Sequence, residues 1–232
     1  MKKDRLHAYA IGIAGGALIV SAILLLLLLR VLQYEEVQMW YADIREFLQD
    51  VENRILNIRD RRVFVLAILC VYLLKSVFPV ISNAALCVLT GLVMPVYYSL
   101  PLNVFGISIV FSVKYWIGRR YGAKTHTLIR KNKTVLSIME GKGQGNPWLL
   151  AAFRFIPWIP LNTVSRLYGQ MKFRYGRYLI VSLFGFAPRL ISYTFIGRNA
   201  YDPLSASFLT PIAVLLVLTG FSLISANAIW RF

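Results

Sequence analysis

Five basic residues stand within long apolar stretches of this 232-residue chain, and they are its most chemically informative side chains. They are Lys75, Lys114, Arg154, Arg166 and Arg189. The sequence offers them almost no acidic partner, because the only Asp or Glu between Val63 and Tyr201 is Glu140. A guanidinium group pairs with phosphate oxygens through two hydrogen bonds, and an ammonium group acts as a point charge. These residue types therefore predict contact with an anionic group.

The five basic residues differ in their expected roles. A charge at the centre of a bilayer costs about 2.5–3.5 kcal/mol even on the lenient insertion scale, so function is the default hypothesis. We expect Arg154 and Arg189 to bind a lipid phosphate. Lys114 lies four residues before Gly118, and we expect it to extend to the membrane interface without a further role. Lys75 and Arg166 are compatible with either role, and both are included in the predicted phosphate-binding set.

The stretch from Phe153 to Gly169, FRFIPWIPLNTVSRLYG, is predicted to be a broken helix. Pro157 and Pro160 each remove a backbone donor and clash with the preceding turn. In lipid, such a break must be buried in protein or line a wet cavity. We expect Asn162 to satisfy freed backbone groups, and a half-helix after Pro160 to add amide donors and a favourable dipole for an anion.

Composition places the chain among membrane proteins. It is 58% hydrophobic and 16% charged, whereas about 25% charged is usual in soluble domains. Residues 8–29 carry no charge and are long enough to cross a hydrocarbon core of about 30 Å, so we expect an uncleaved signal anchor. The net charge of +16 falls mainly in short loops beside apolar segments. This positive-inside pattern predicts anionic membrane lipids as partners, and no nucleic acid.

The chain is predicted to be an all-α, polytopic membrane protein made of four segments. These are an N-terminal transmembrane helix (1–32), an amphipathic interfacial helix (33–62), a core (63–198) and a C-terminal transmembrane helix (199–232). Within the core we distinguish a first repeat (63–119), a basic cytoplasmic loop (120–146) and a second repeat (147–198).

An internal repeat organises the core. The matched residues are Pro79 with Pro157, Gly91 with Gly169, Gly106 with Gly185, and Gly118 with Gly197, in register but for one gap. Each copy would be a re-entrant helical hairpin followed by one transmembrane helix, so the two copies would be inverted. We expect structural roles, setting breaks and close packing, for Pro79, Gly91, Pro157, Pro160, Asn162, Gly169, Gly185, Pro188 and Gly197. The charge distribution predicts that both termini lie in the cytoplasm, and we expect the protein in the plasma membrane.

At this point the sequence resembles a known family. The pattern Arg154-x-x-Pro157-x-x-Pro160-x-Asn162, with Gly169, Gly185-x-x-Pro188 and Gly197, is similar to the second half of the VTT domain. That domain defines the SNARE-associated Golgi protein superfamily, which includes bacterial DedA proteins, and the branch with an FRxxPxxP core is the most similar. The resemblance covers about residues 63–198. It implies two opposed re-entrant hairpins and the movement of phospholipids or polyprenyl phosphates. Some DedA proteins also carry membrane carboxylates linked to proton coupling, which this chain lacks.

The leading functional hypothesis is a flippase- or scramblase-like protein that moves an anionic phospholipid or polyprenyl phosphate between leaflets. The alternatives are a proton- or ion-coupled carrier of a small anion, and a non-transporting scaffold for membrane homeostasis. An enzyme is not expected, because His7 and His126 lie outside the core and no nucleophile–base arrangement is visible. Cys70 and Cys87 lie far from either histidine, so the sequence predicts no metal site and no cofactor.

Overall fold

The computed structural model describes residues 2–32, 41, 46–48, 50, 61–78, 81–121, 146–156 and 159–230. Within these ranges every regular element is a helix, so the all-α prediction is confirmed. Most of the predicted interfacial helix (33–62) and of the predicted basic loop (120–146) lies outside the described residues, as do Pro79 and Pro157.

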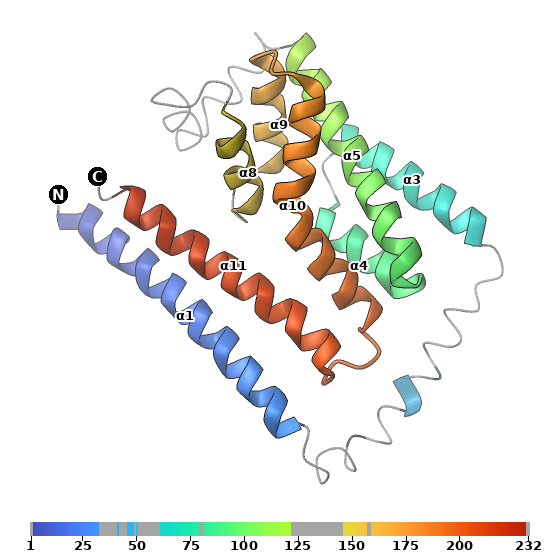
Figure 1. Cartoon of the computed structure of the whole chain (residues 1–232), viewed down its shortest axis with the longest axis vertical. Helices are drawn as coiled ribbons and strands as arrows, with labels where there is room; N and C mark the ends of the chain where they lie inside the picture. Colours follow the sequence, from blue (N-terminus) through green and yellow to red (C-terminus); the bar gives the residue numbers. More distant parts are fainter. Residues whose placement is uncertain are drawn as a thin grey trace. The chain divides into compact units, whose positions relative to one another are not determined.

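Eight helices are long enough to be named in the described part of the chain, and Figure 1 labels them. In chain order they are α1 (Lys2–Leu32), α3 (Arg61–Val77), α4 (Asn83–Val93), α5 (Val96–Arg120), α8 (Pro147–Phe155), α9 (Leu161–Gln170), α10 (Tyr175–Arg198) and α11 (Ala206–Trp230).

Four of these helices contain segments long and apolar enough to cross a membrane. The segments are Gly12–Leu32, Val96–Arg120, Tyr175–Arg198 and Ala206–Ser225. Large apolar side chains on them are exposed, for example Phe184 at 82%, as expected for surfaces that face lipid. The chain is therefore a multi-pass membrane protein.

The other four helices are shorter. α3, α4, α8 and α9 have 17, 11, 9 and 10 residues. At 1.5 Å per residue even the longest reaches only about 26 Å, less than the hydrocarbon thickness of about 30 Å. They lie in the two predicted repeats, for which the sequence analysis expected re-entrant hairpins, and that expectation stays a prediction.

The chain divides into two compact units, which are described separately. The first unit comprises Met1–Asp60, Cys87–Leu100 and Ile191–Phe232, and the second comprises Arg61–Leu86 and Pro101–Leu190. Both units draw on both predicted repeats. All five of the embedded basic residues belong to the second unit.

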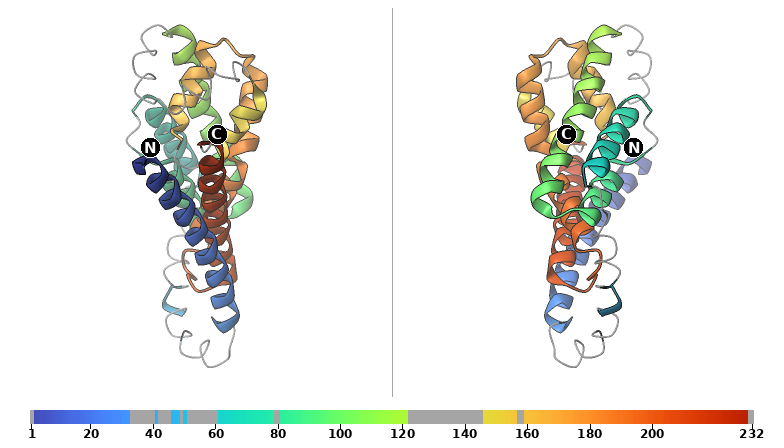
Figure 2. Two further views of the ribbon diagram at one scale, coloured as in Figure 1. Left: turned by 90° about the vertical axis from the view of Figure 1, so that its left-hand side faces the viewer. Right: turned by 90° about the vertical axis from the view of Figure 1, so that its right-hand side faces the viewer.

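In the first unit, α1 and α11 form an antiparallel pair that meets at two glycines (Figures 1 and 2). A Cβ atom on Gly15 would lie 2.9 Å from the carbonyl oxygen of Gly220, so the two backbones approach closely there. Small residues at such a crossing are typical of helix packing in membranes, where van der Waals contact between backbones stabilises the pair. The two chain ends lie at the same end of this pair.

The first unit also contains a crossing of α4 with the end of α10, built on one glycine from each helix. A Cβ on Gly91 would overlap the carbonyl oxygen of Thr194 and lie 3.1 Å from the backbone nitrogen of Arg198. A Cβ on Gly197 would overlap the carbonyl oxygen of Val88. Neither helix could approach so closely with a larger residue at its glycine.

The second unit contains a crossing of α9 with α5 that is built in the same way. A Cβ on Gly169 would overlap the carbonyl oxygen of Tyr115 and lie 3.0 Å from the backbone nitrogen of Arg119. A Cβ on Gly118 would overlap the carbonyl oxygen of Arg166. In each crossing, the short helix of one predicted repeat thus packs on the long helix of the other.

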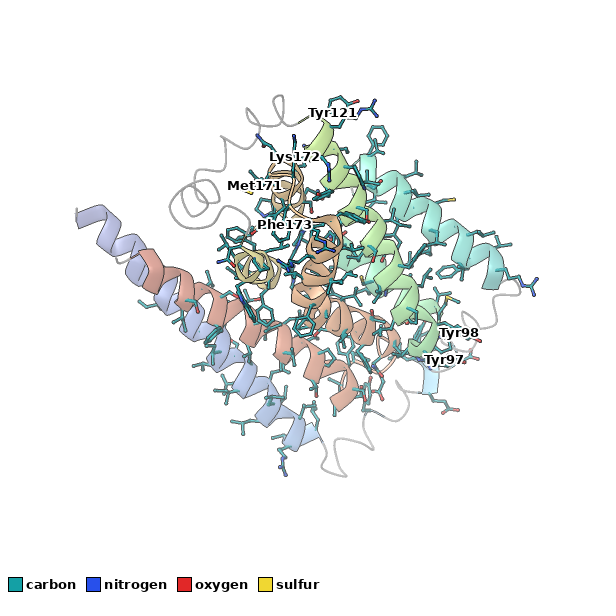
Figure 3. The ribbon with its side chains drawn as sticks, turned by 45° about the horizontal axis from the view of Figure 1, so that its top comes forward. Tyr97, Tyr98, Tyr121, Met171, Lys172 and Phe173 are labelled. Carbon is teal, nitrogen blue, oxygen red and sulfur yellow. The ribbon has the colours of Figure 1, made fainter. Side chains whose placement is uncertain are left out.

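The turn between α9 and α10 is fixed by backbone hydrogen bonds of the Schellman type. Lys172 N donates to Gly169 O at 3.0 Å, and Phe173 N donates to Tyr168 O at 3.2 Å. Lys172 has a φ of +54°, in the left-handed region that glycine usually fills. The ring of Phe173 packs edge-on against Tyr168, and the hydroxyl of Tyr115 donates to the carbonyl of Phe173. Figure 3 labels Met171, Lys172 and Phe173 at this turn.

Two residues for which the sequence analysis expected structural roles, Gly185 and Pro188, lie within α10. Pro188 lies inside α10, which continues through it from Tyr175 to Arg198, so this proline does not end a helix. Gly185 faces α8, where a Cβ would lie 2.8 Å from the carbonyl oxygen of Ala151 and 2.9 Å from Cβ of Arg154. Gly185 therefore lets α10 pack directly beside Arg154.

Candidate functional site

Arg154 lies in the last turn of α8, in the second unit, with 0% of its surface exposed. Its Nη1 donates to the carbonyl of Leu161 at 2.9 Å. Its Nη2 donates to the hydroxyls of Ser165 at 2.8 Å and Tyr178 at 2.9 Å. The guanidinium thus connects three helices, α8, α9 and α10, through neutral oxygens.

Local sequence explains why Arg154 can reach these partners. α8 begins with Asn146, whose side chain accepts a hydrogen bond from Trp148 N at 2.9 Å, and with Pro147 in the first turn, where no amide donor is needed. α8 ends at Phe155, and α9 begins at Leu161, after Pro160, as the sequence predicted. Arg154 therefore hydrogen-bonds across the break between the two helices.

Aromatic rings complete the surroundings of Arg154. Its guanidinium carbon lies 4.0 Å from the centre of the Phe111 ring and 5.7 Å from that of Tyr178. The hydroxyl of Tyr178 donates in turn to the carbonyl of Phe111 at 3.2 Å. Cation–π contacts contribute about 2 kcal/mol when they are desolvated, so these rings offset part of the cost of burying the charge.

Arg189 contacts another phenylalanine ring, which in turn packs against Phe111. Its guanidinium carbon is 5.2 Å from the centre of the Phe186 ring, and Phe186 packs edge-on against Phe111 at 5.8 Å. The Arg154 guanidinium lies over the face of the Phe111 ring. The two arginines that the sequence analysis singled out for phosphate binding are thus joined through two phenylalanine rings, and Arg189 is the less buried of them.

Arg166 and Lys114 form a second basic group on the crossing of α9 with α5. The positive charge of Arg166 acts on Lys114, which is 1% exposed. The sequence analysis expected the Lys114 ammonium to extend to the interface, whereas the structure encloses this side chain. Lys75, the remaining predicted phosphate-binding residue, lies in the last turn of α3 with 6% exposed.

The arrangement presents a buried positive charge whose donors are partly used. Arg154 offers charge, yet three of its donor positions are already directed at protein oxygens. Its Nε has no hydrogen-bond partner in the described part of the chain. The described residues contain no group of three or more His, Cys, Asp and Glu that could hold a metal ion. What the second unit concentrates is positive charge beside aromatic rings.

Sequence reasoning missed Ser165, Tyr178 and Phe111, the partners that hold Arg154 in place. Ser165 carried a usable signal, because Leu161, Ser165 and Tyr168 share one face of α9 at helical spacing. Tyr178 and Phe111 carried none, since they lie 24 positions after and 43 positions before Arg154 on other helices. Asn162 lies half-buried in the first turn of α9.

Comparison with known proteins gives one match. The family model described as the VTT domain matches residues 78–199, which is more than half of the chain. The match includes Lys114, Arg154, Arg166 and Arg189, and it excludes Lys75. Neither the curated proteins nor the solved structures that were compared contain a match to this chain.

Proposed function

Because this chain belongs to the VTT domain family, we propose that it moves an anionic phospholipid or a polyprenyl phosphate between the two leaflets of the membrane. The observation that carries the proposal is the excess of cations inside one apolar unit. Lys75, Lys114, Arg154, Arg166 and Arg189 lie there, and Glu140 is the only acidic residue between Val63 and Tyr201. An anionic ligand would lower the electrostatic cost of placing so many positive charges in one apolar unit.

The proposed architecture is a pair of inverted repeats, each a re-entrant hairpin followed by a transmembrane helix. Its support is that the crossing of α4 with α10 and the crossing of α9 with α5 are built in the same way. Gly91 and Gly169 occupy equivalent places in the repeat, and each meets a carbonyl oxygen and a backbone nitrogen on the long helix of the other repeat. Gly118 and Gly197 meet the short helices in return. The same contact thus occurs twice, each time between the short helix of one repeat and the long helix of the other, as expected for two related halves.

In the proposed mechanism the phosphate passes along the basic surfaces of the second unit while the acyl or prenyl chains stay in lipid. Arg189 is the first candidate for direct contact, because it is only half-buried and stands on the Phe186 ring. Arg154 already directs three of its donors at protein oxygens, so it has fewer donors left for a phosphate, whereas Arg166 and Lys75 offer further charge. We propose that the lipid gradient drives the movement, because the core segments 64–139 and 141–201 contain no carboxylate for proton coupling. No covalent bond changes.

Leaflet exchange in proteoliposomes tests this function. Vesicles that contain the purified chain and a trace of head-group-labelled phospholipid or labelled polyprenyl phosphate should lose outer and inner label to a membrane-impermeant quencher. Protein-free vesicles should keep the inner label. Arg189→Gln should slow exchange by about 10-fold or more, the effect of one lost charge-assisted hydrogen bond.

Arg177→Gln is the matched control, because Arg177 is an exposed arginine in the first turn of the same helix. It should leave the rate of exchange unchanged. If the wild-type chain exchanges neither lipid, or if Arg189→Gln and wild type exchange at equal rates, the proposed function is wrong. Exchange that requires a proton gradient would favour the ion-coupled carrier instead.

A further inference from the structure

Lys114 is a buried cation to which the described structure gives no hydrogen-bond partner. The residue lies in α5 with 1% of its surface exposed, and its Nζ makes no hydrogen bond to any described residue. An ammonium group carries three donors and no acceptor. Burying such a charge without compensation is expensive, and removing it from water requires an opposite charge or several acceptors. The side chain is therefore positioned for a partner that the described residues do not supply.

The neighbour of Lys114 is a second cation. Gly118, one helical turn after Lys114, lies against the backbone of Arg166, because a Cβ on Gly118 would overlap the Arg166 carbonyl oxygen and lie 2.6 Å from its Cα. This crossing fixes Arg166 beside the turn of α5 that carries Lys114, and the charge of Arg166 acts on Lys114. The Nε of Arg166 is also buried without a hydrogen-bond partner among the described residues.

Two like charges held together need an anion more than either charge alone does. Their positive charges repel each other, so negative charge placed near both would stabilise the pair. Glu140 is the single acidic residue between Val63 and Tyr201. Arg154 differs in this respect, since its Nη atoms already donate to three protein oxygens.

We propose that Lys114 Nζ and the Arg166 guanidinium together bind one phosphate-type oxyanion at the crossing of α5 with α9. Lysine supplies a point charge and arginine a planar fork, a combination that suits the oxygens of a phosphate. The same chemistry is offered by the head group of an anionic lipid and by free inorganic phosphate. This site is separate from the Arg154 network, and it would exist in a protein that moves no lipid at all.

Equilibrium binding to the full-length chain in a neutral detergent tests the site. One arm measures binding of radiolabelled inorganic phosphate, and the other measures a short-chain phosphatidic acid by native mass spectrometry, with a zwitterionic short-chain lipid for comparison. Wild type should bind one equivalent in at least one arm. Lys114→Met and Arg166→Gln should each weaken that binding by about 10-fold or more, the loss expected for one charge-assisted hydrogen bond.

Several variants keep the outcome decisive. Arg177→Gln removes an exposed arginine of the same unit and should bind like wild type. Lys114→Arg keeps the charge, and it should retain binding even if Lys114→Met fails to fold. Combining Lys114→Met with Arg166→Gln should weaken binding little beyond either change, because both act on one ligand.

Three results would overturn the proposal. The first is a wild-type chain that binds neither phosphate nor phosphatidic acid. The second is equal binding by wild type, Lys114→Met and Arg166→Gln. The third is a marked loss of thermal stability in Glu140→Gln that Lys114→Met suppresses, which would identify that carboxylate as the counter-ion. Loss of lipid exchange with intact phosphate binding would contradict only the transport function, and the two proposals can therefore fail separately.

Discussion

At the scale of single residues, Arg154 shows how a fully buried charge can be held without a carboxylate. Two hydroxyls and one backbone carbonyl accept its hydrogen bonds, and the face of Phe111 lies 4.0 Å from its guanidinium carbon. All of these partners are neutral, so the positive charge is solvated by dipoles and remains available to attract an anion nearby. Lys114 lacks hydrogen-bond partners of this kind among the described residues.

Tyr178→Phe should destabilise the protein by about 1.5–3 kcal/mol, the usual contribution of a hydrogen bond to a charged group. The change removes the hydroxyl that accepts from Arg154 and donates to Phe111, and it keeps the ring. Thermal or denaturant unfolding of the purified chain in detergent measures the difference. Tyr97→Phe, at a tyrosine that is 68% exposed, is the control and should change stability little. Equal unfolding curves for the two variants would show that the Arg154 network does not hold the helices together.

At the scale of elements, the glycines at the crossings of α4 with α10 and of α9 with α5 approach a neighbouring backbone more closely than the other described glycines do. Gly118→Ala and Gly169→Ala should each destabilise the protein by about 3 kcal/mol, the upper range for overpacking, because the added methyl group meets backbone atoms that cannot rotate away. Gly176→Ala is the matched control, since nothing lies within 4 Å of a Cβ there. It should be neutral or stabilising by about 0.5–1 kcal/mol, because alanine is the better helix former. Unfolding midpoints in detergent rank the three variants, and a different order would contradict the close approach of α5 and α9.

The turn after α9 provides a second prediction at this scale. Lys172→Gly should stabilise the protein by about 1 kcal/mol, because glycine adopts the positive φ of this position without the steric cost that a side chain carries. The Lys172 side chain is exposed, so little packing is lost. Lys172→Ala keeps the Cβ and should bring no such gain. Chemical denaturation compares the two variants, and a gain for both would mean that the backbone conformation is not the cause.

How far the sequence could predict these elements depends on the range of the interactions. The long apolar runs, the start of α9 after Pro160 and the matched glycines were all visible, because they rest on local composition and regular spacing. The exchange of α4 and α9 between the repeats was not, since glycine spacing does not say which helix lies opposite. The burial of Lys114 was not predictable for the same reason, because it depends on the approach of α9 at Gly118.

At the scale of the whole molecule, the chain is a multi-pass membrane protein of the VTT domain family, and its five embedded basic residues belong to one of two units. The phosphate-binding role of the candidate site stays a prediction. Residue type alone singled out Arg154 and Arg189, but the ring pair that joins them, Phe111 and Phe186, comes from helices distant in sequence. A single sequence contains no information on such pairings until the helices are placed.

Both termini should lie on the same side of the membrane. The support is the antiparallel pairing of α1 with α11 through Gly15 and Gly220. A reporter that is active only in the cytoplasm should give equal signals when it is fused in turn to each terminus. Because of the positive-inside pattern, we predict that both fusions are active. A third fusion within the basic segment 120–146 should also be active. Opposite signals from the two ends would exclude the pairing as the native arrangement.

The exchanged crossings also impose an order on biosynthesis. Gly91 and Gly197 are 106 positions apart, whereas Gly118 and Gly169 are only 51 apart. A ribosome that adds 5–20 residues per second takes roughly 5 to 20 s to extend the chain from Gly91 to Gly197. α4 therefore remains without the end of α10, its packing partner, at a stage when α5 and α9 can already pack together. α4 is synthesised before α9, but its packing contact forms later. A nascent chain that stops before the end of α10 should therefore leave the glycine face of α4 exposed to membrane chaperones and proteases.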